Sequence, residues 1–371
     1  MSKGKIIRNL IFVFAILLLV ILMVISLGDI KKIFNVLSNT KISFIFLAIL
    51  FVLLYAITYQ ASLMLLTKYR YKDIKFIDLY AISGTEFFFN AITPFSSGGQ
   101  PFQAYALKRK NMKLSDSTSA LLINFIAYQI CLNLICVVFI ILYYNRVYEQ
   151  INGFIAFLIV GFSINMIIMI GLILIGTVKP IVKLFIFLYD KLCKIKFLNK
   201  LSNKRENFIN YIDNMQNAFK EIIKSFKLWI FILLTKILSF AFYYSIPFIA
   251  LYAIGVEIKI ADLPYTLALT AFVLTIAIWV PTPGASGGVE YAFKELYSPF
   301  IEGYGYSEND ALQMSLAVMM IWRMLTYYLL ILYGFILYLI FEKRDRRNNI
   351  SLVQPKENSD IMVTDKINEE W

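Results

Sequence analysis

The chain has 371 residues, of which 60% are hydrophobic and only 16% are charged. Soluble domains carry roughly 25% charged residues, so this composition indicates a polytopic membrane protein. The chain has no histidine, and Cys131, Cys136 and Cys193 lack metal-ligand spacing. We therefore expect no metal, no cofactor and no histidine-dependent catalytic triad.

Six apolar runs are long enough to cross a bilayer. They lie at about 10–27, 42–66, 116–143, 154–176, 228–254 and 312–341. The first follows a basic start and precedes no small-residue cleavage site, so we expect a retained helix rather than a signal peptide. Two more apolar stretches, at about 77–107 and 263–297, are each interrupted once.

Both interruptions have the pattern Thr-Pro-x-x-Ser-Gly-Gly, as TPFSSGG from Thr93 and TPGASGG from Thr282. Pro94 and Pro283 cannot continue a preceding helix, and the glycine pairs allow unusual dihedrals. Irregular backbone at membrane depth is tolerated only where it is buried in protein or lines a wet cavity. A helix that restarts after each Gly-Gly would offer free N–H groups to an anion. The alternative is a tightly packed hairpin turn without a ligand.

Basic residues mark cytoplasmic loops and orient the chain. Lys and Arg flank the stretch 77–107 on both sides, whereas acidic segments flank the stretch 263–297. Each stretch is therefore predicted to enter and leave on one side, the first from the cytoplasm and the second from outside, with both chain termini cytoplasmic.

The predicted fold class is an all-α polytopic integral membrane protein with about six full spans plus two re-entrant helical hairpins in an inverted repeat. The membrane transport domain is expected at 1–341, with repeat one at 42–143 and repeat two at 228–341. A disordered cytoplasmic tail is expected at 342–371. Secondary transporters place their substrate between two such discontinuous helices.

The segment 177–227 is predicted to be a basic, amphipathic cytoplasmic element. Its apolar positions from Phe208 to Ile222 recur at helical spacing. Two interpretations are open, a helix lying on anionic lipid and a helix packing on the bundle.

Ionisable residues inside spans cost about 2.5–3.5 kcal/mol each, so each is a functional candidate. The alternative for Lys236 and Arg323 is pairing with Glu86 or Glu290, and Lys236 could also snorkel. Glu290 could instead pair with Lys294. The predicted substrate-binding residues are Glu86, Asn90, Thr93, Ser97, Gly98, Gly99, Gln100, Arg109, Lys236, Thr282, Gly284, Gly287, Gly288, Glu290 and Arg323, with Pro94 and Pro283 as hairpin breakers and no catalytic residue.

The segments TPFSSGGQPFQAYALKR and PTPGASGGVEYAF resemble two motifs of the membrane domain of lysylphosphatidylglycerol synthases, the multiple peptide resistance factors, and of stand-alone relatives. The resemblance covers residues 5–341. It implies translocation of an aminoacylated phospholipid to the outer leaflet. Gln100 stands where the family usually has an acidic residue, so a cation-binding role is not expected there.

The predicted function is a lipid flippase or transporter that moves a phospholipid or lipid-linked headgroup across the bacterial cytoplasmic membrane. The alternatives are a phosphatidylglycerol lysyltransferase-type enzyme and an accessory membrane subunit of one. Because the family's soluble synthase domain does not follow the last span, we expect no lysyltransferase activity in this chain. The expected partners are a membrane lipid with an anionic or zwitterionic headgroup, a separate lipid synthase and a second copy of the chain, but no nucleic acid.

Overall fold

The computed structural model describes residues 30–151, 155–194, 205–277, 280 and 282–353. Within these ranges the fold is helical and has no strand, which confirms the predicted all-α class. Six helices are long and apolar enough to span a membrane. They are α3 (Ile42–Arg70), α6 (Leu114–Ile151), α7 (Ile155–Thr177), α10 (Phe226–Ala253), the segment Ile260–Ala277 that contains α11 (Leu263–Ala277), and Glu308–Arg346.

Five predicted spans are confirmed as long apolar helices, while the predicted span 10–27 lies outside the described residues. The sixth long helix contains α11, which was predicted as one arm of a re-entrant hairpin. Its 18 residues extend about 27 Å, close to the roughly 30 Å of a hydrocarbon core. A helix of this length can cross the bilayer, so its length does not decide between a crossing and a re-entrant path. The re-entrant path of 263–297 stays a prediction.

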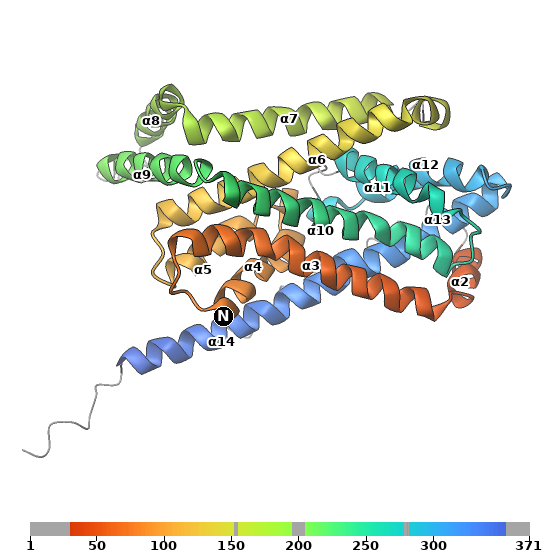
Figure 1. The fold of residues 1–371 in the computed structure, drawn as a ribbon, viewed down its shortest axis with the longest axis horizontal. Helices are drawn as coiled ribbons and strands as arrows, with labels where there is room; N and C mark the ends of the chain where they lie inside the picture. Colours follow the sequence, from red (N-terminus) through yellow and green to blue (C-terminus); the bar gives the residue numbers. More distant parts are fainter. Residues whose placement is uncertain (1–29, 152–154, 195–204, 278–279, 281, 354–371) are drawn as a thin grey trace, which may run out of the picture.

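Each repeated motif joins two short helices into a hairpin. The first hairpin consists of α4 (Phe76–Ala91), the turn η1 (Pro94–Ser96) and α5 (Gly99–Lys108). The second consists of α11, η5 (Pro283–Ala285) and α12 (Gly288–Glu302). The first hairpin opens toward the left of Figure 1 and the second toward the right, and their turns contact each other.

The two turns have the same unusual backbone at matching motif positions. Phe95 and Ser96 have φ of 54° and 49°, and Gly284 and Ala285 have 63° and 53°. Non-glycine residues rarely adopt positive φ, because Cβ crowds the following carbonyl. The repeated sequence thus specifies a repeated local conformation, and the prolines begin both turns as expected for hairpin breakers.

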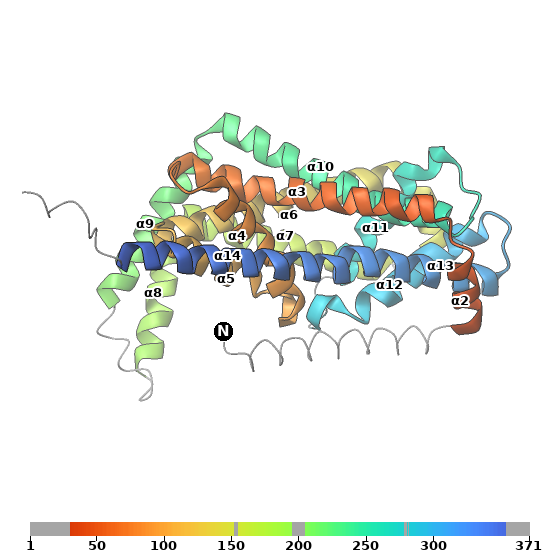
Figure 2. The same cartoon turned by 90° about the horizontal axis from the view of Figure 1, so that it is seen from below.

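A long helical element runs beside the first hairpin. It comprises α13 (Glu308–Arg323), a π-helical turn η6 (Met324–Tyr328) and α14 (Leu329–Val353), which extend along the molecule in Figure 2. Glycines allow α14 to pack closely on α4, because a Cβ on Gly334 would lie 2.6 Å from the Phe88 nitrogen. The expected disordered tail at 342–371 is wrong in its first part, since α14 continues to Val353.

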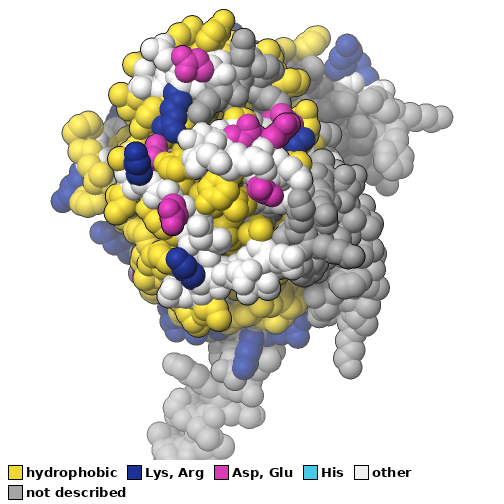
Figure 3. Space-filling model, turned by 90° about the vertical axis from the view of Figure 1, so that its right-hand side faces the viewer, with side chains coloured by type: hydrophobic (Ala, Val, Ile, Leu, Met, Phe, Trp, Pro, Cys, Tyr) yellow, Lys and Arg dark blue, Asp and Glu magenta, His cyan; other side chains and the backbone are white. Residues whose placement is uncertain are grey.

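The open base of each hairpin is held by a long helix from the other predicted repeat. At the first base, Arg344 of α14 donates to Asp78 of α4 over 2.7 Å. At the second base, Arg146 of α6 pairs with Asp262 over 2.9 Å, and its guanidinium lies 3.8 Å from the Tyr265 ring centroid. Figure 3 shows the end of the molecule at which the second hairpin opens, where acidic and basic side chains are interspersed.

The segment predicted as amphipathic contains α8 (Lys179–Cys193) and α9 (Arg205–Ile223). Along α9 the apolar stripe is buried against the bundle at Ile212, Met215, Phe219 and Ile222. The Ser119 hydroxyl of α6 also donates to the Met215 carbonyl over 2.7 Å. Of the two open interpretations, the stripe therefore packs on protein rather than on lipid.

Candidate functional site

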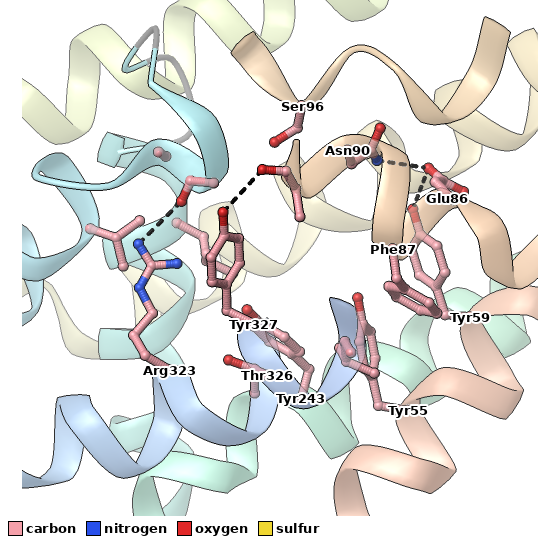
Figure 4. A pocket seen from close by; sticks show the side chains of 16 residues that line it. Tyr55, Tyr59, Glu86, Phe87, Asn90, Ser96, Tyr243, Arg323, Thr326 and Tyr327 are labelled. Carbon is pink, nitrogen blue, oxygen red and sulfur yellow. Dashed lines mark hydrogen bonds between the residues drawn. The ribbon is translucent and has the colours of Figure 1, made fainter. Parts of the chain in front are cut away.

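A cavity of about 190 Å³ lies where the two hairpin turns meet. A single water occupies about 10–15 Å³ of such a cavity, so the space suits a small polar group but is too small for acyl chains. Side chains from both hairpins, α3, α10 and the π-helical turn form its wall (Figure 4). The lining residues are Tyr55, Tyr59, Glu86, Phe87, Asn90, Ala91, Ser96, Tyr243, Leu274, Gly284, Ala285, Val289, Arg323, Thr326, Tyr327 and Leu330.

Glu86 lies at one side of the cavity, and its carboxylate is buried. Its hydrogen-bond donors are all neutral. The Tyr59 hydroxyl donates over 3.0 Å, and the amides of Asn90 and Gln103 donate over 3.4 Å each. Because Gln103 belongs to α5, this carboxylate connects both arms of the first hairpin with α3.

Lys236 of α10 is fully buried, so the snorkelling alternative is wrong. Its ammonium lies 4.0 Å from the centroid of the Tyr59 ring and 3.4 Å from the Tyr59 carbonyl oxygen. The hydroxyl of the same tyrosine contacts Glu86. Tyr59 therefore contacts both charged groups, and Lys236 is not among the residues that line the cavity.

Arg323, at the opposite side of the cavity, forms a buried ion pair with Glu290 of α12 (Figure 4 shows the arginine). Its Nε and a terminal nitrogen lie 2.8 Å and 2.7 Å from Glu290 Oε1. The guanidinium also donates to the Gly284 carbonyl over 3.1 Å. Pairing is thus the correct interpretation of Arg323. The proposed pair of Glu290 with Lys294 is wrong, because Lys294 pairs with Glu295 over 3.1 Å.

The first Gly-Gly pair does not offer its amides to the cavity. The Gly98 N–H donates to the Thr93 hydroxyl and the Gly99 N–H to the Asn90 side-chain oxygen, each over 2.8 Å. The turn thereby caps its own following helix, as N-cap side chains do elsewhere. Two amides expected to face an anion are satisfied by protein instead.

In the second Gly-Gly pair, the first amide is likewise satisfied by a protein side chain. The Gly287 N–H donates to Glu290 over 2.6 Å, and the Thr282 hydroxyl donates to the Ser286 carbonyl over 2.7 Å. Gly288 is required for packing, since an added Cβ would lie 2.3 Å from a Val280 methyl carbon. The glycine pairs therefore build the turns, while Ser96, Gly284 and Ala285 of the same motifs line the cavity.

Of the fifteen predicted substrate-binding residues, four line the cavity, namely Glu86, Asn90, Gly284 and Arg323, and the other eleven do not. Arg109, Ser97 and Gln100 are among those eleven. Arg109, at the C-terminal end of α5, pairs with Glu342 over 2.7 Å and with Asp345. It belongs to the ion pairs that hold the first hairpin base. Ser97 is exposed directly after η1, and Gln100 lies half-buried at the N-terminal end of α5.

Four of the lining residues that the sequence did not identify are tyrosines. Tyr55, Tyr59, Tyr243 and Tyr327 all line the cavity, but among 24 tyrosines none stands out by residue type. The four-residue spacing of Tyr55 and Tyr59 inside an apolar span is the signal that could have placed both hydroxyls on one helix face.

The π-helical turn connects the two hairpins. Arg323, which precedes it, holds the Gly284 carbonyl of the second turn, and the Tyr327 hydroxyl donates to the Ala91 carbonyl of α4 over 3.1 Å. Both bonds are drawn in Figure 4. Single π-helical turns inside α-helices occur frequently at functional sites.

The fold and this buried, charged cavity define a multi-pass membrane protein. The chain belongs to the family described as the lysylphosphatidylglycerol synthase TM region, which matches residues 10–334. This confirms the resemblance inferred from the two motifs, and it fits a role connected with membrane lipids. No curated protein matches the chain.

Proposed function

We propose that the protein is a lipid flippase or transporter that moves a phospholipid or lipid-linked headgroup across the cytoplasmic membrane. One observation carries the proposal. The two hairpins open at opposite ends, and their matching turns meet at a cavity that Glu86 and Arg323 line. Transporters bind substrate at such junctions because both halves of the protein can then control access to it.

The cavity geometry favours a lipid with its chains outside. Its volume suits a headgroup, and Ser96 both lines the cavity and is exposed at the first turn. The neighbouring Phe95 is 56% exposed. A headgroup could enter beside this turn while its acyl chains remain in the bilayer.

The charges suit an anionic or zwitterionic headgroup. Arg323 offers a guanidinium, which binds phosphate through a planar fork of donors, although Glu290 already engages one face. On the other side, Glu86 and the surrounding tyrosines suit a positive group. A headgroup with both signs would contact both sides.

The proposed topology has both hairpins re-entrant and both termini cytoplasmic. Single cysteines replacing Lys72 or Lys113 should react with an impermeant thiol reagent from the cytoplasmic side, in a background lacking the native cysteines. Cysteines replacing Lys259 or Glu302 should react only from outside. Opposite sidedness within either pair would overturn the re-entrant path and the symmetric site.

The function is tested with purified protein in liposomes that contain a fluorescent phosphatidylglycerol. A membrane-impermeant reductant bleaches only outer-leaflet label, so flippase activity raises the bleached fraction above that of empty liposomes. Glu86→Ala should abolish this gain, whereas Glu295→Gln, on the outer part of α12, should retain it. A wild-type protein that behaves like empty liposomes contradicts the proposal.

The family's description names a synthase, so a lipid-modifying activity is the rival function. Incubation of the purified protein with phosphatidylglycerol and lysyl-tRNA distinguishes the two. The flippase proposal predicts unmodified lipid by mass spectrometry, and a lysylated product would favour the enzyme.

A further inference from the structure

Two buried acid–base pairs flank the cavity, and they differ in geometry. Arg323 and Glu290 are in direct contact at 2.7–2.8 Å, and Glu290 is not part of the cavity wall. Glu86 does line the cavity, and its contact with Lys236 runs through Tyr59, whose hydroxyl bonds the carboxylate and whose ring face meets the ammonium. Glu290 is therefore held in a direct ion pair with Arg323, whereas Glu86 has no such direct contact with Lys236.

The hydrogen bonds of Glu86 are those of a group that can accept a proton. Hydrogen bonds to an ionised carboxylate are typically about 2.5–2.9 Å long, whereas the three donors to Glu86 lie at 3.0–3.4 Å. A buried carboxylate with weak compensation lowers its free energy by becoming neutral. The chain has no histidine, and Glu86 is the carboxylate that lines the cavity, so Glu86 is the group in the wall that can become neutral by taking up a proton.

The groups that face Glu86 come from several elements. Tyrosines contribute from α3 and α6, an ammonium from α10, an amide from α5, and a paired guanidinium stands across the cavity. They are Tyr55, Tyr59, Tyr128, Lys236, Gln103 and Arg323. Tyrosines ordinarily titrate near pH 10 and stay neutral around neutral pH, so the net charge on this side of the cavity is set by Glu86 and Lys236.

We propose that Glu86 carries a proton that is bound together with an anionic headgroup, so that lipid translocation is coupled to protons. The inference rests on the proposed function. Arg323 and Glu290 cancel each other, and Lys236 cancels an ionised Glu86. When a proton from water binds a Glu86 oxygen, Lys236 becomes the uncompensated cation at the described site. An anionic headgroup restores neutrality, and the same proton leaves when the headgroup does.

The binding test uses the full-length protein in detergent with dihexanoyl phosphatidylglycerol as probe. Calorimetry in buffers of different ionisation enthalpy should show net proton uptake on binding. Affinity should fall with rising pH, by up to about tenfold per pH unit, the limit for one linked proton. Dihexanoyl phosphatidylcholine, whose headgroup has no net charge, should bind without this uptake.

Variants identify the group that accepts the proton. Glu86→Gln should bind the anionic probe without proton uptake, and Glu295→Gln should behave as wild type. Tyr59→Phe removes a donor to the carboxylate, which favours the protonated form, so the midpoint of its pH dependence should move to higher pH. Wild-type binding without proton uptake, or an unchanged pH profile in Tyr59→Phe, overturns the inference.

Infrared difference spectra keep the test decisive if Glu86→Gln does not fold. Anionic probe added to wild type should produce a protonated-carboxyl band, and its absence contradicts the proposal.

The liposome assay distinguishes a failure of the flippase function from a failure of the proton coupling. Wild-type protein that fails to translocate lipid overturns the flippase function. Translocation whose pH dependence persists in Glu86→Gln overturns only the proton coupling.

Discussion

The buried pair of Arg323 and Glu290 allows a quantitative prediction. Arg323→Met leaves a fully buried Glu290 carboxylate with the Gly287 N–H as its remaining donor. Removing one partner of a buried pair costs about 3–5 kcal/mol, and the Gly284 carbonyl that loses its donor adds about 1–3 kcal/mol. We expect the unfolding equilibrium to shift by at least about 10²-fold.

The double variant Arg323→Met/Glu290→Gln should recover most of this loss. It buries no charge, and the glutamine oxygen can still accept from Gly287. Thermal or denaturant unfolding in detergent, followed by tryptophan fluorescence, gives the double-mutant cycle. Two single losses that simply add in the double variant would refute the ion-pair reasoning. Translocation should remain impaired in the refolded double variant, because the guanidinium is also proposed to meet the headgroup.

Two further predictions concern the junction of the hairpins. Gly284→Ala should destabilise the protein more than Gly255→Ala. Both glycines have positive φ, but a Cβ at Gly284 would lie 2.3 Å from the Tyr327 ring, whereas a Cβ at Gly255 would meet nothing within 4 Å. Strain alone costs about 1–2 kcal/mol, and overpacking adds about 1–3 kcal/mol, so equal shifts in unfolding temperature would contradict the packing argument. Tyr327→Phe should cost about 0.5–1.5 kcal/mol through its bond to Ala91, whereas Tyr328→Phe, whose hydroxyl is buried without a partner among the described residues, should cost less. Similar unfolding temperatures for these two variants would show that the hydroxyl bond does not hold the hairpins together.

The cross-repeat ion pairs explain why the hairpins stay open at opposite ends. Asp78 and Asp262 are each held by an arginine from the long helix that ends the other predicted repeat. A charged pair at a hairpin base fixes that base against the neighbouring long helix.

The site was predicted in part. Glu86, Asn90, Gly284 and Arg323 do line one cavity, although nearly 240 residues separate the first from the last. Charge inside a span identified Glu86 and Arg323, because such residues are costly unless they have a role. The sequence offered Glu86 and Glu290 as alternative partners of Arg323 but could not choose, since Glu290 reaches Arg323 only through the packing of α12 on α13.

The sequence by itself determined the helical membrane class, the positions of the long helices and the two turns, because apolar length and proline–glycine chemistry act locally. It also determined which side chains would be expensive to bury. Only the tertiary structure decided that the amides of Gly98, Gly99 and Gly287 are capped by Thr93, Asn90 and Glu290, that Tyr59 contacts both Glu86 and Lys236, and that α9 packs on protein. Those outcomes depend on which helices meet, and contacts between distant segments leave no periodic signal in the chain.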